Sequence, residues 1–114
     1  MAECPSCEIP LVQQRTPSGV MYGCPGCHGK SVALAVLRNA GASHDFVKEL
    51  WLQSARPELP RVRRCPHCGR PMAQATVPAG YLPLALDVCR LCGAIWFDPL
   101  EYESVPRTAP RPSP

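Results

Sequence analysis

The start of the chain has the hydrophobic and polar pattern of a β-hairpin. Ile9, Leu11 and Val12 stand among polar residues in the segment 8–15, and a second short apolar run occupies residues 20–23. The tripeptide Pro17-Ser18-Gly19 separates the two runs and is a strong turn signal. We therefore expect two antiparallel strands, with a pair of cysteines near each open end, in a first unit that spans residues 1–30.

Residues 31–55 follow a helical period instead. Ser31 is placed to cap a short helix with apolar residues at 32, 34, 36 and 37, and Gly41 is placed to end it. Ser43 is placed to cap a second helix, whose apolar residues recur at the spacing i, i+1, i+4, i+5: Phe46, Val47, Leu50 and Trp51. We expect this helical insert to pack its apolar stripe against the units on either side of it.

The second half of the chain repeats the plan of the first. Residues 56–64 form a linker by composition, because their two prolines prevent a helix from continuing. A second unit then spans residues 65–103, and its expected strands are residues 71–78, 82–88 and 94–98. Residues 104–114 are rich in proline, and we expect them to form a disordered tail.

All eight cysteines belong to four Cys-x-x-Cys pairs. Sixteen residues separate the first two pairs and twenty separate the last two, which matches the spacing of zinc sites with four cysteine ligands. Two such turns at the ends of a hairpin can supply four tetrahedral thiolate ligands. The sequence therefore predicts two Zn²⁺ ions per chain, with these ligands: Cys4, Cys7, Cys24 and Cys27 for one, and Cys65, Cys68, Cys89 and Cys92 for the other.

Other uses of the cysteines fit the sequence less well. Four disulfides would suit a secreted chain, but the N-terminus lacks the basic start and apolar run of a signal peptide. A redox Cys-x-x-Cys pair would need a βαβ pattern, which is missing. Pairing the first two cysteines with a distant pair would close much longer loops. Iron in a rubredoxin-like site remains an alternative, since similar turns bind both metals.

A site closed by four cysteines has no open position for water or substrate, so we expect both metals to be structural. The only histidines are His28, His44 and His67, and none is grouped with Ser and Asp as in a catalytic triad. There is no glycine-rich phosphate loop either. We therefore expect a chain that is not an enzyme, in which His28 and His67 are surface residues rather than metal ligands.

Composition and charge agree with a small metal-stabilised protein. The apolar residues of the 114-residue chain are scattered among 15 prolines and 8 glycines, so no single large core is evident, and metal is expected to replace it. Two sites with four thiolates each change the formal net charge from +3 to about −1, which gives no support for nucleic-acid binding. The longest apolar run, residues 32–37, is too short to cross a membrane. We expect a soluble cytoplasmic protein with reduced thiols.

Two groups of residues invite a binding role. Trp96 and Phe97 are adjacent in a strand and cannot pack on the same face, so either one of them is an exposed contact or both are buried between units. Tyr102 could extend such a surface. Five arginines gather around the second unit, either as a phosphate-binding patch or to offset the charge of the metal site, and we favour the second interpretation: Arg61, Arg63, Arg64, Arg70 and Arg90.

The second unit resembles the bacterial transcription factor IIB-type zinc-ribbon family. The resemblance rests on Cys65-Pro-His-Cys-Gly-Arg-Pro-Met, on Leu-Asp-Val before Cys89-Arg-Leu-Cys-Gly, and on the following Ala-Ile-Trp-Phe-Asp with Glu101 soon after. It implies that Cys65, Cys68, Cys89 and Cys92 bind zinc. In the first unit Glu8 and His28 replace the glycines of the pattern, and the third strand looks replaced by the helices.

The whole layout is also similar to the cytosolic N-terminal region of some rhomboid-family membrane proteases. The expected fold is thus a small metal-stabilised α+β protein, with two zinc ribbons of short antiparallel strands joined by a helical segment. We expect a non-catalytic double zinc-ribbon module that docks a protein partner. The alternatives are a transcription-associated zinc ribbon that binds DNA or RNA, for which a salt titration is diagnostic, and a rubredoxin-like electron carrier.

Overall fold

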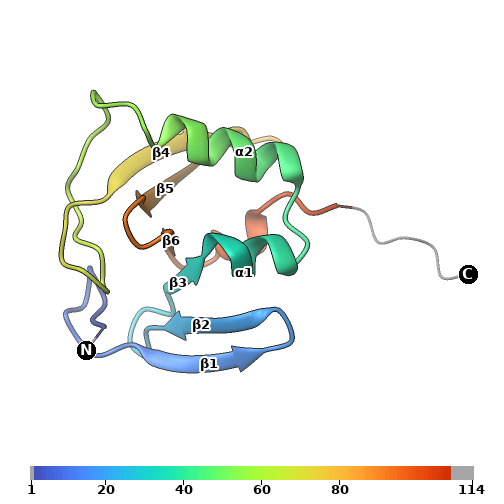
Figure 1. Cartoon of the computed structure of the whole chain (residues 1–114). Coiled ribbons are helices and arrows are strands. Elements are labelled where there is room, and N and C mark those ends of the chain that lie inside the picture. The colour runs from blue at the N-terminus through green and yellow to red at the C-terminus, as the bar shows by residue number, and fades with distance from the viewer. Residues whose placement is uncertain (1, 109–114) are drawn as a thin grey trace, which may run out of the picture.

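The computed structural model describes residues 2–108 and contains six strands and two α-helices in that range. Figure 1 shows their order along the chain. The elements are β1 (Val12–Thr16), β2 (Gly19–Gly23), β3 (Lys30–Ala33), α1 (Leu34–Asn39), α2 (His44–Gln53), β4 (Ala73–Val77), β5 (Leu84–Cys89), β6 (Ala94–Phe97) and a short 3-10 turn, η1 (Tyr102–Ser104).

All six strands belong to one antiparallel sheet with the order β1-β2-β3-β6-β5-β4. Each half of the chain contributes three consecutive strands, and the halves join where β3 pairs with β6. The two predicted hairpins are thus confirmed as β1–β2 and β4–β5. The protein is a small α+β fold, but its strands share one sheet rather than forming two separate ones.

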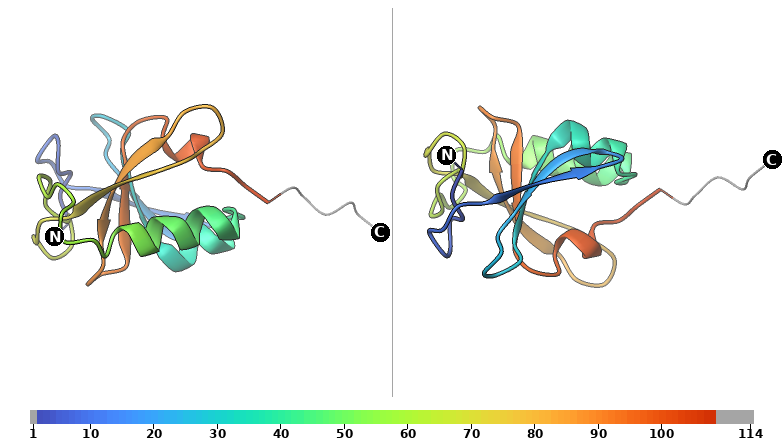
Figure 2. Two further views of the ribbon diagram at one scale, coloured as in Figure 1. Left: turned by 90° about the horizontal axis from the view of Figure 1, so that it is seen from above. Right: turned by 90° about the horizontal axis from the view of Figure 1, so that it is seen from below.

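Both helices lie on one side of this sheet, as Figure 2 shows. The main core lies between the helices and the sheet, and it includes Leu37 of α1, Phe46 and Leu50 of α2, and Ile95 and Phe97 of β6. Ser43 caps α2 by accepting a hydrogen bond from the backbone N–H of Phe46, as its position predicts. The expected packing of the apolar stripe of α2 is confirmed for its three buried residues, Phe46, Val47 and Leu50.

The predicted start of the first helix is wrong. Residues Lys30–Ala33 form β3, and α1 begins only at Leu34 without a side-chain cap. The reason is that β3 lies between two strands, with Val32 opposite Met21 on one side and Ile95 on the other. These neighbouring strands form hydrogen bonds with the backbone of β3 and bury Val32. An extension of the short helix α1 over the same residues would gain less stability, because short helices are only marginally stable. The third strand of the first half is therefore present, not replaced by the helices.

The expected disorder from residue 104 onward is also wrong as far as residue 108. Val105 is buried in the main core, the carbonyl of Pro106 accepts a hydrogen bond from the Ser43 N–H, and the Thr108 N–H donates to the Gly41 carbonyl. These contacts tie the segment to the turn between α1 and α2. The rest of the predicted tail, residues 109–114, lies outside the described residues.

Candidate metal centres

The structure brings the eight cysteines together in the two predicted groups of four. Within each group all four Sγ atoms lie within 4.8 Å of one another. Cys4 and Cys27 Sγ are 3.7 Å apart, and Cys68 and Cys89 Sγ are 3.6 Å apart. Four sulfurs at about 2.3 Å from a tetrahedral metal would be about 3.8 Å apart, whereas a disulfide requires about 2.05 Å. The spacing fits a metal site and excludes disulfides between these pairs.

Each cysteine pair lies in the same kind of turn. The Cys4 sulfur accepts hydrogen bonds from the backbone N–H groups of Ser6 and Cys7 at 3.4 and 3.3 Å, and the Cys24 sulfur accepts one from Cys27 at 3.4 Å. The His67 N–H donates to the Cys65 sulfur at the same distance of 3.4 Å. Such donors stabilise a thiolate, so the turns are suited to charged sulfur ligands.

The fourth residue after the first cysteine of each pair has a left-handed backbone. Its φ is 59° at Glu8, 67° at His28, 78° at Gly69 and 66° at Gly93. At Glu8, His28 and Gly69 the residue's N–H donates to the carbonyl of that first cysteine, which closes the turn. In the second turn this conformation falls on His28 rather than on the neighbouring Gly26 or Gly29, because the position in the turn decides it.

This geometry predicts that glycine at positions 8 and 28 stabilises the protein. A residue with a Cβ atom is strained at positive φ, so Glu8→Gly and His28→Gly should each raise the free energy of unfolding by about 1 kcal/mol. Gly69→Ala and Gly93→Ala, where a Cβ atom would meet no neighbouring atom within 4 Å, should each lower it by a similar amount. Urea unfolding of the metal-loaded protein measures all four. If Glu8→Gly and His28→Gly both destabilised the protein, the explanation from backbone strain would be contradicted.

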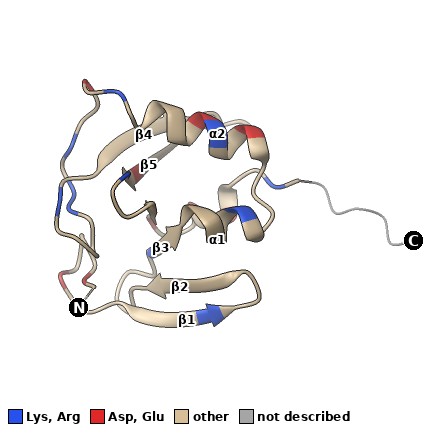
Figure 3. Cartoon of the chain, viewed as in Figure 1, with Lys and Arg blue, Asp and Glu red and all other residues tan. Residues whose placement is uncertain are grey.

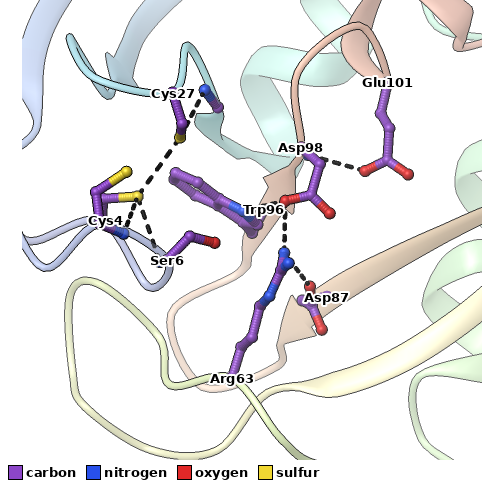
Figure 4. A network of polar contacts seen from close by, with 10 residues as sticks. Cys4, Ser6, Cys27, Arg63, Asp87, Trp96, Asp98 and Glu101 are labelled. Carbon is purple, nitrogen blue, oxygen red and sulfur yellow. Dashed lines mark hydrogen bonds and ion pairs between the residues drawn. The ribbon is translucent and has the colours of Figure 1, made fainter.

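The first cysteine of every pair is buried, while Cys7, Cys68 and Cys92 are exposed and Cys27 is half-buried. The four buried cysteines share one apolar cluster with Met72 and Trp96. Trp96 therefore connects the two cysteine groups, as Figure 4 shows for its approach to Cys4 and Cys27. A Cβ atom on Gly29 would lie only 2.4 Å from Trp96 Cζ2, so glycine is required where the indole meets the first site.

Trp96 and Phe97 are both fully buried, on opposite faces of the sheet. Phe97 faces the helices in the main core, and Trp96 faces the cysteine groups. The interpretation that one of them is an exposed contact is wrong, because the N-terminal turns and the segment before β4 cover the face that the helices leave open. Tyr102 is half-buried against Phe97, with ring centroids 5.4 Å apart.

A partly buried polar network holds Trp96 and the sheet together. Arg63 Nη1 lies 2.5 Å from Asp98 Oδ1 and 3.5 Å from Asp87 Oδ2, and Trp96 Nε1 donates to the same Asp98 oxygen at 3.2 Å. Glu101 accepts a hydrogen bond from the Asp98 N–H at 2.8 Å. Figure 4 shows Arg63 between the two aspartates. The acidic and aromatic positions of the second unit's motif thus meet in one structural network.

Burial in this network raises the pKa of Asp87 to about 6, with Arg63 acting in the opposite direction. Burial similarly raises the pKa of Glu101. Arg63 was expected only to offset the metal site or bind phosphate, and sequence reasoning missed these partners. The signal was available in the pattern, since acidic residues that precede and follow a cysteine pair on neighbouring strands require a cation when they are buried.

The thiols of each group cannot all ionise together without a cation. The backbone N–H of Arg70 lowers the pKa of Cys68 to about 7, whereas burial raises the pKa of Cys92 to about 12. In the other group, burial acts to raise the pKa of Cys24, but backbone N–H groups outweigh it and lower the pKa to about 7. Hydrogen bonds with neighbouring thiols raise the pKa of Cys7 to about 12. A divalent cation would compensate the crowded charges, and its binding would release protons.

The donor set decides which metals fit. Each group offers four sulfurs and, among the described residues, no carboxylate or imidazole joins them. Sulfur ligands suit zinc, iron and other soft metals rather than magnesium or calcium. A shell of four protein ligands is closed, so the arrangement can hold a metal and stabilise the fold, but it leaves no position for a bound substrate.

The two histidines near the cysteines have other environments. His67 Nε2 lies 2.8 Å from the hydroxyl of Ser31, and its ring packs edge-on against Tyr22 with centroids 5.0 Å apart. Burial lowers the pKa of His67. The His67 side chain thus links the second cysteine group to Tyr22 in β2 and Ser31 in β3, a role that the sequence did not suggest. His28 is exposed and occupies the left-handed turn position.

Three of the five arginines have side-chain partners within residues 2–108. Besides Arg63, Arg64 donates to the Gly69 carbonyl at 3.0 Å. Arg90 donates to the Trp51 carbonyl at 2.5 Å and to the Ser54 hydroxyl at 3.0 Å, and its guanidinium stacks on the Trp51 ring at 4.3 Å. The five side chains thus do not form one continuous phosphate-binding patch.

Comparison with models of known protein families finds no match, and no curated protein and no solved structure is significantly similar to the chain. Within residues 2–108, neither helix has the length and hydrophobicity needed to cross a membrane.

Proposed function

We propose that this chain is a non-catalytic double zinc-ribbon module, in which two structural Zn²⁺ ions hold a surface for docking a protein partner. The observation that carries this proposal is the pair of closed four-cysteine groups connected through Trp96. Each three-stranded half would be one ribbon, with its zinc bound by the cysteine pairs at the ends of its first hairpin. Residues Cys65, Cys68, Cys89 and Cys92, with Trp96 and Asp98, support the resemblance to the transcription factor IIB-type ribbon family.

The function follows from what the geometry offers. Four cysteine ligands would fill the coordination shell of each metal, so no position is left at which the metal could bind a substrate. The exposed surface instead carries large apolar side chains that the core does not use, among them Tyr81, Leu82 and Leu91. Tyr81 and Leu82 are adjacent in the loop between β4 and β5, and exposed apolar side chains that lie together, unlike single ones, are typical of protein contacts. Docking is therefore the activity that the surface supports best.

Elemental analysis of the purified, unheated protein tests the proposal. We expect two zinc atoms per chain and no absorption in the visible range. Two iron atoms with strong visible absorption would instead identify a rubredoxin-like electron carrier. A protein that contains no transition metal and is fully folded would contradict the proposal.

The nucleic-acid alternative has a separate test. We expect single-stranded and duplex oligonucleotides to bind weakly at physiological salt, because Arg63 and Arg64 are engaged within the chain and the five arginines do not form one continuous patch. Tight binding whose logarithm falls steeply with the logarithm of salt concentration would favour phosphate recognition over docking.

A further inference from the structure

A groove lies beside the second cysteine group and has a mixed basic and aliphatic lining. Its volume is about 460 Å³, and its lining includes Arg61, Arg70 and Arg90 together with Pro71, Val88 and Leu91. Leu91 is 67% exposed. Figure 3 shows that basic residues recur along the segment between α2 and β4, which supplies one wall of the groove.

Arg90 is held in place at this groove by α2. Both of its hydrogen bonds within the described residues come from Nη1, to the Trp51 carbonyl and the Ser54 hydroxyl, and the Trp51 ring covers one face of its guanidinium. An arginine that is already ordered loses less conformational entropy when it binds a ligand. All three arginines of the groove, Arg61, Arg70 and Arg90, are exposed, and Arg90 is also held in place by α2.

The charges at the groove favour an anionic occupant. No acidic residue lines it. A metal site with four thiolates carries about −2, and the three arginines of the lining exceed that charge. Arg63, whose charge is already compensated by Asp87 and Asp98, does not contribute. The arginines therefore do more than offset the metal site.

We propose that this groove binds a segment of the partner protein in which acidic residues flank an aliphatic side chain. The proposal rests on the docking function proposed above and names the chemistry of its partner. Guanidinium groups pair with carboxylates in a two-pronged geometry, and Pro71 and Leu91 offer the aliphatic side chain an apolar contact. A nucleic acid is disfavoured because no aromatic ring lines the groove for base stacking.

The test uses the zinc-loaded chain and a pool of fluorescein-labelled octapeptides with leucine at position four and only Asp or Glu elsewhere. Fluorescence anisotropy should show saturable binding of the acidic pool and at least tenfold weaker binding of the same pool made with Asn and Gln. The double variant Arg61→Ser with Arg70→Ser should lose at least tenfold in affinity, and Leu91→Ser should also weaken binding. The matched control, Arg15→Ser with Arg38→Ser, removes the same charge from β1 and α1 and should bind like the unmodified chain.

Three results would overturn the proposal: no saturable binding at millimolar concentration, equal loss in the two double variants, or tighter binding of a single-stranded oligonucleotide of equal charge. Each variant is also checked for two zinc atoms per chain and for its melting temperature. If zinc content and folding are intact and the acidic pool does not bind, only the groove is refuted. If the unmodified chain holds no zinc, the double zinc-ribbon proposal itself fails.

Discussion

Removal of metal from both cysteine groups is expected to unfold the chain. The cysteine turns, which precede and follow the β1–β2 and β4–β5 hairpins, have no disulfide cross-link, since all eight thiols are free. Without a cation the thiols of each group cannot all ionise near neutral pH, since the pKa of Cys7 and of Cys92 is raised to about 12, although the pKa of Cys24 and of Cys68 is lowered to about 7. Structural zinc contributes on the order of 10–16 kcal/mol in small domains, as much as or more than the net stability of a typical domain.

Circular dichroism during titration with a strong zinc chelator measures this effect. We expect the sheet signal and the cooperative thermal transition to be lost together, and to return when zinc is added back under reducing conditions. The same chelator added to a metal-free protein of known stability controls for direct effects on the signal. An unchanged spectrum and melting temperature after complete metal removal would show that the sheet is stable without metal.

Substitution of Trp96 by alanine is expected to have the second largest effect. The indole is 1% exposed, contacts the cluster of buried cysteines and donates a hydrogen bond to Asp98. Its removal should leave a cavity between the two metal sites and cost about 3–5 kcal/mol of unfolding free energy. Because the same side chain contacts both sites, we also expect zinc affinity to fall at both.

Urea unfolding and competition with a chromogenic zinc chelator measure the two effects of Trp96→Ala. The matched control is Trp51→Ala, because Trp51 is only half-buried and stacks on Arg90 at the protein surface. Because Trp51 also packs partly against the main core, that variant should cost about 2 kcal/mol, less than Trp96→Ala, and leave zinc affinity unchanged. Equal stability of the two variants would refute the assignment of Trp96 as the connection between the sites.

The ligands could be predicted from sequence because their signal is local. Each cysteine pair forms one turn, and the spacing between pairs is set by one hairpin, so Cys4 to Cys27 and Cys65 to Cys92 form two self-contained patterns. The cap at Ser43 and the buried stripe of α2 are local as well. In each case a few neighbouring residues are enough to determine the structure.

The contacts between the two halves could not be predicted, because they depend on residues far apart in sequence. Lys30–Ala33 looks helical from its neighbours, but pairing with β6, more than sixty residues later, makes it a strand. The pairing of Arg63 with Asp98 and the contact of His67 with Ser31 arise in the same way. Val105 is buried for a similar reason, since the turn between α1 and α2 gives the proline-rich segment a surface to pack on.

X-ray absorption at the zinc edge of the native protein is the most direct test of the double four-cysteine site. We expect two zinc atoms per chain, each surrounded by four sulfurs at about 2.3 Å and by no nitrogen or oxygen. Zinc with oxygen or nitrogen ligands at about 2.0 Å, or a single zinc atom per chain, would contradict this expectation.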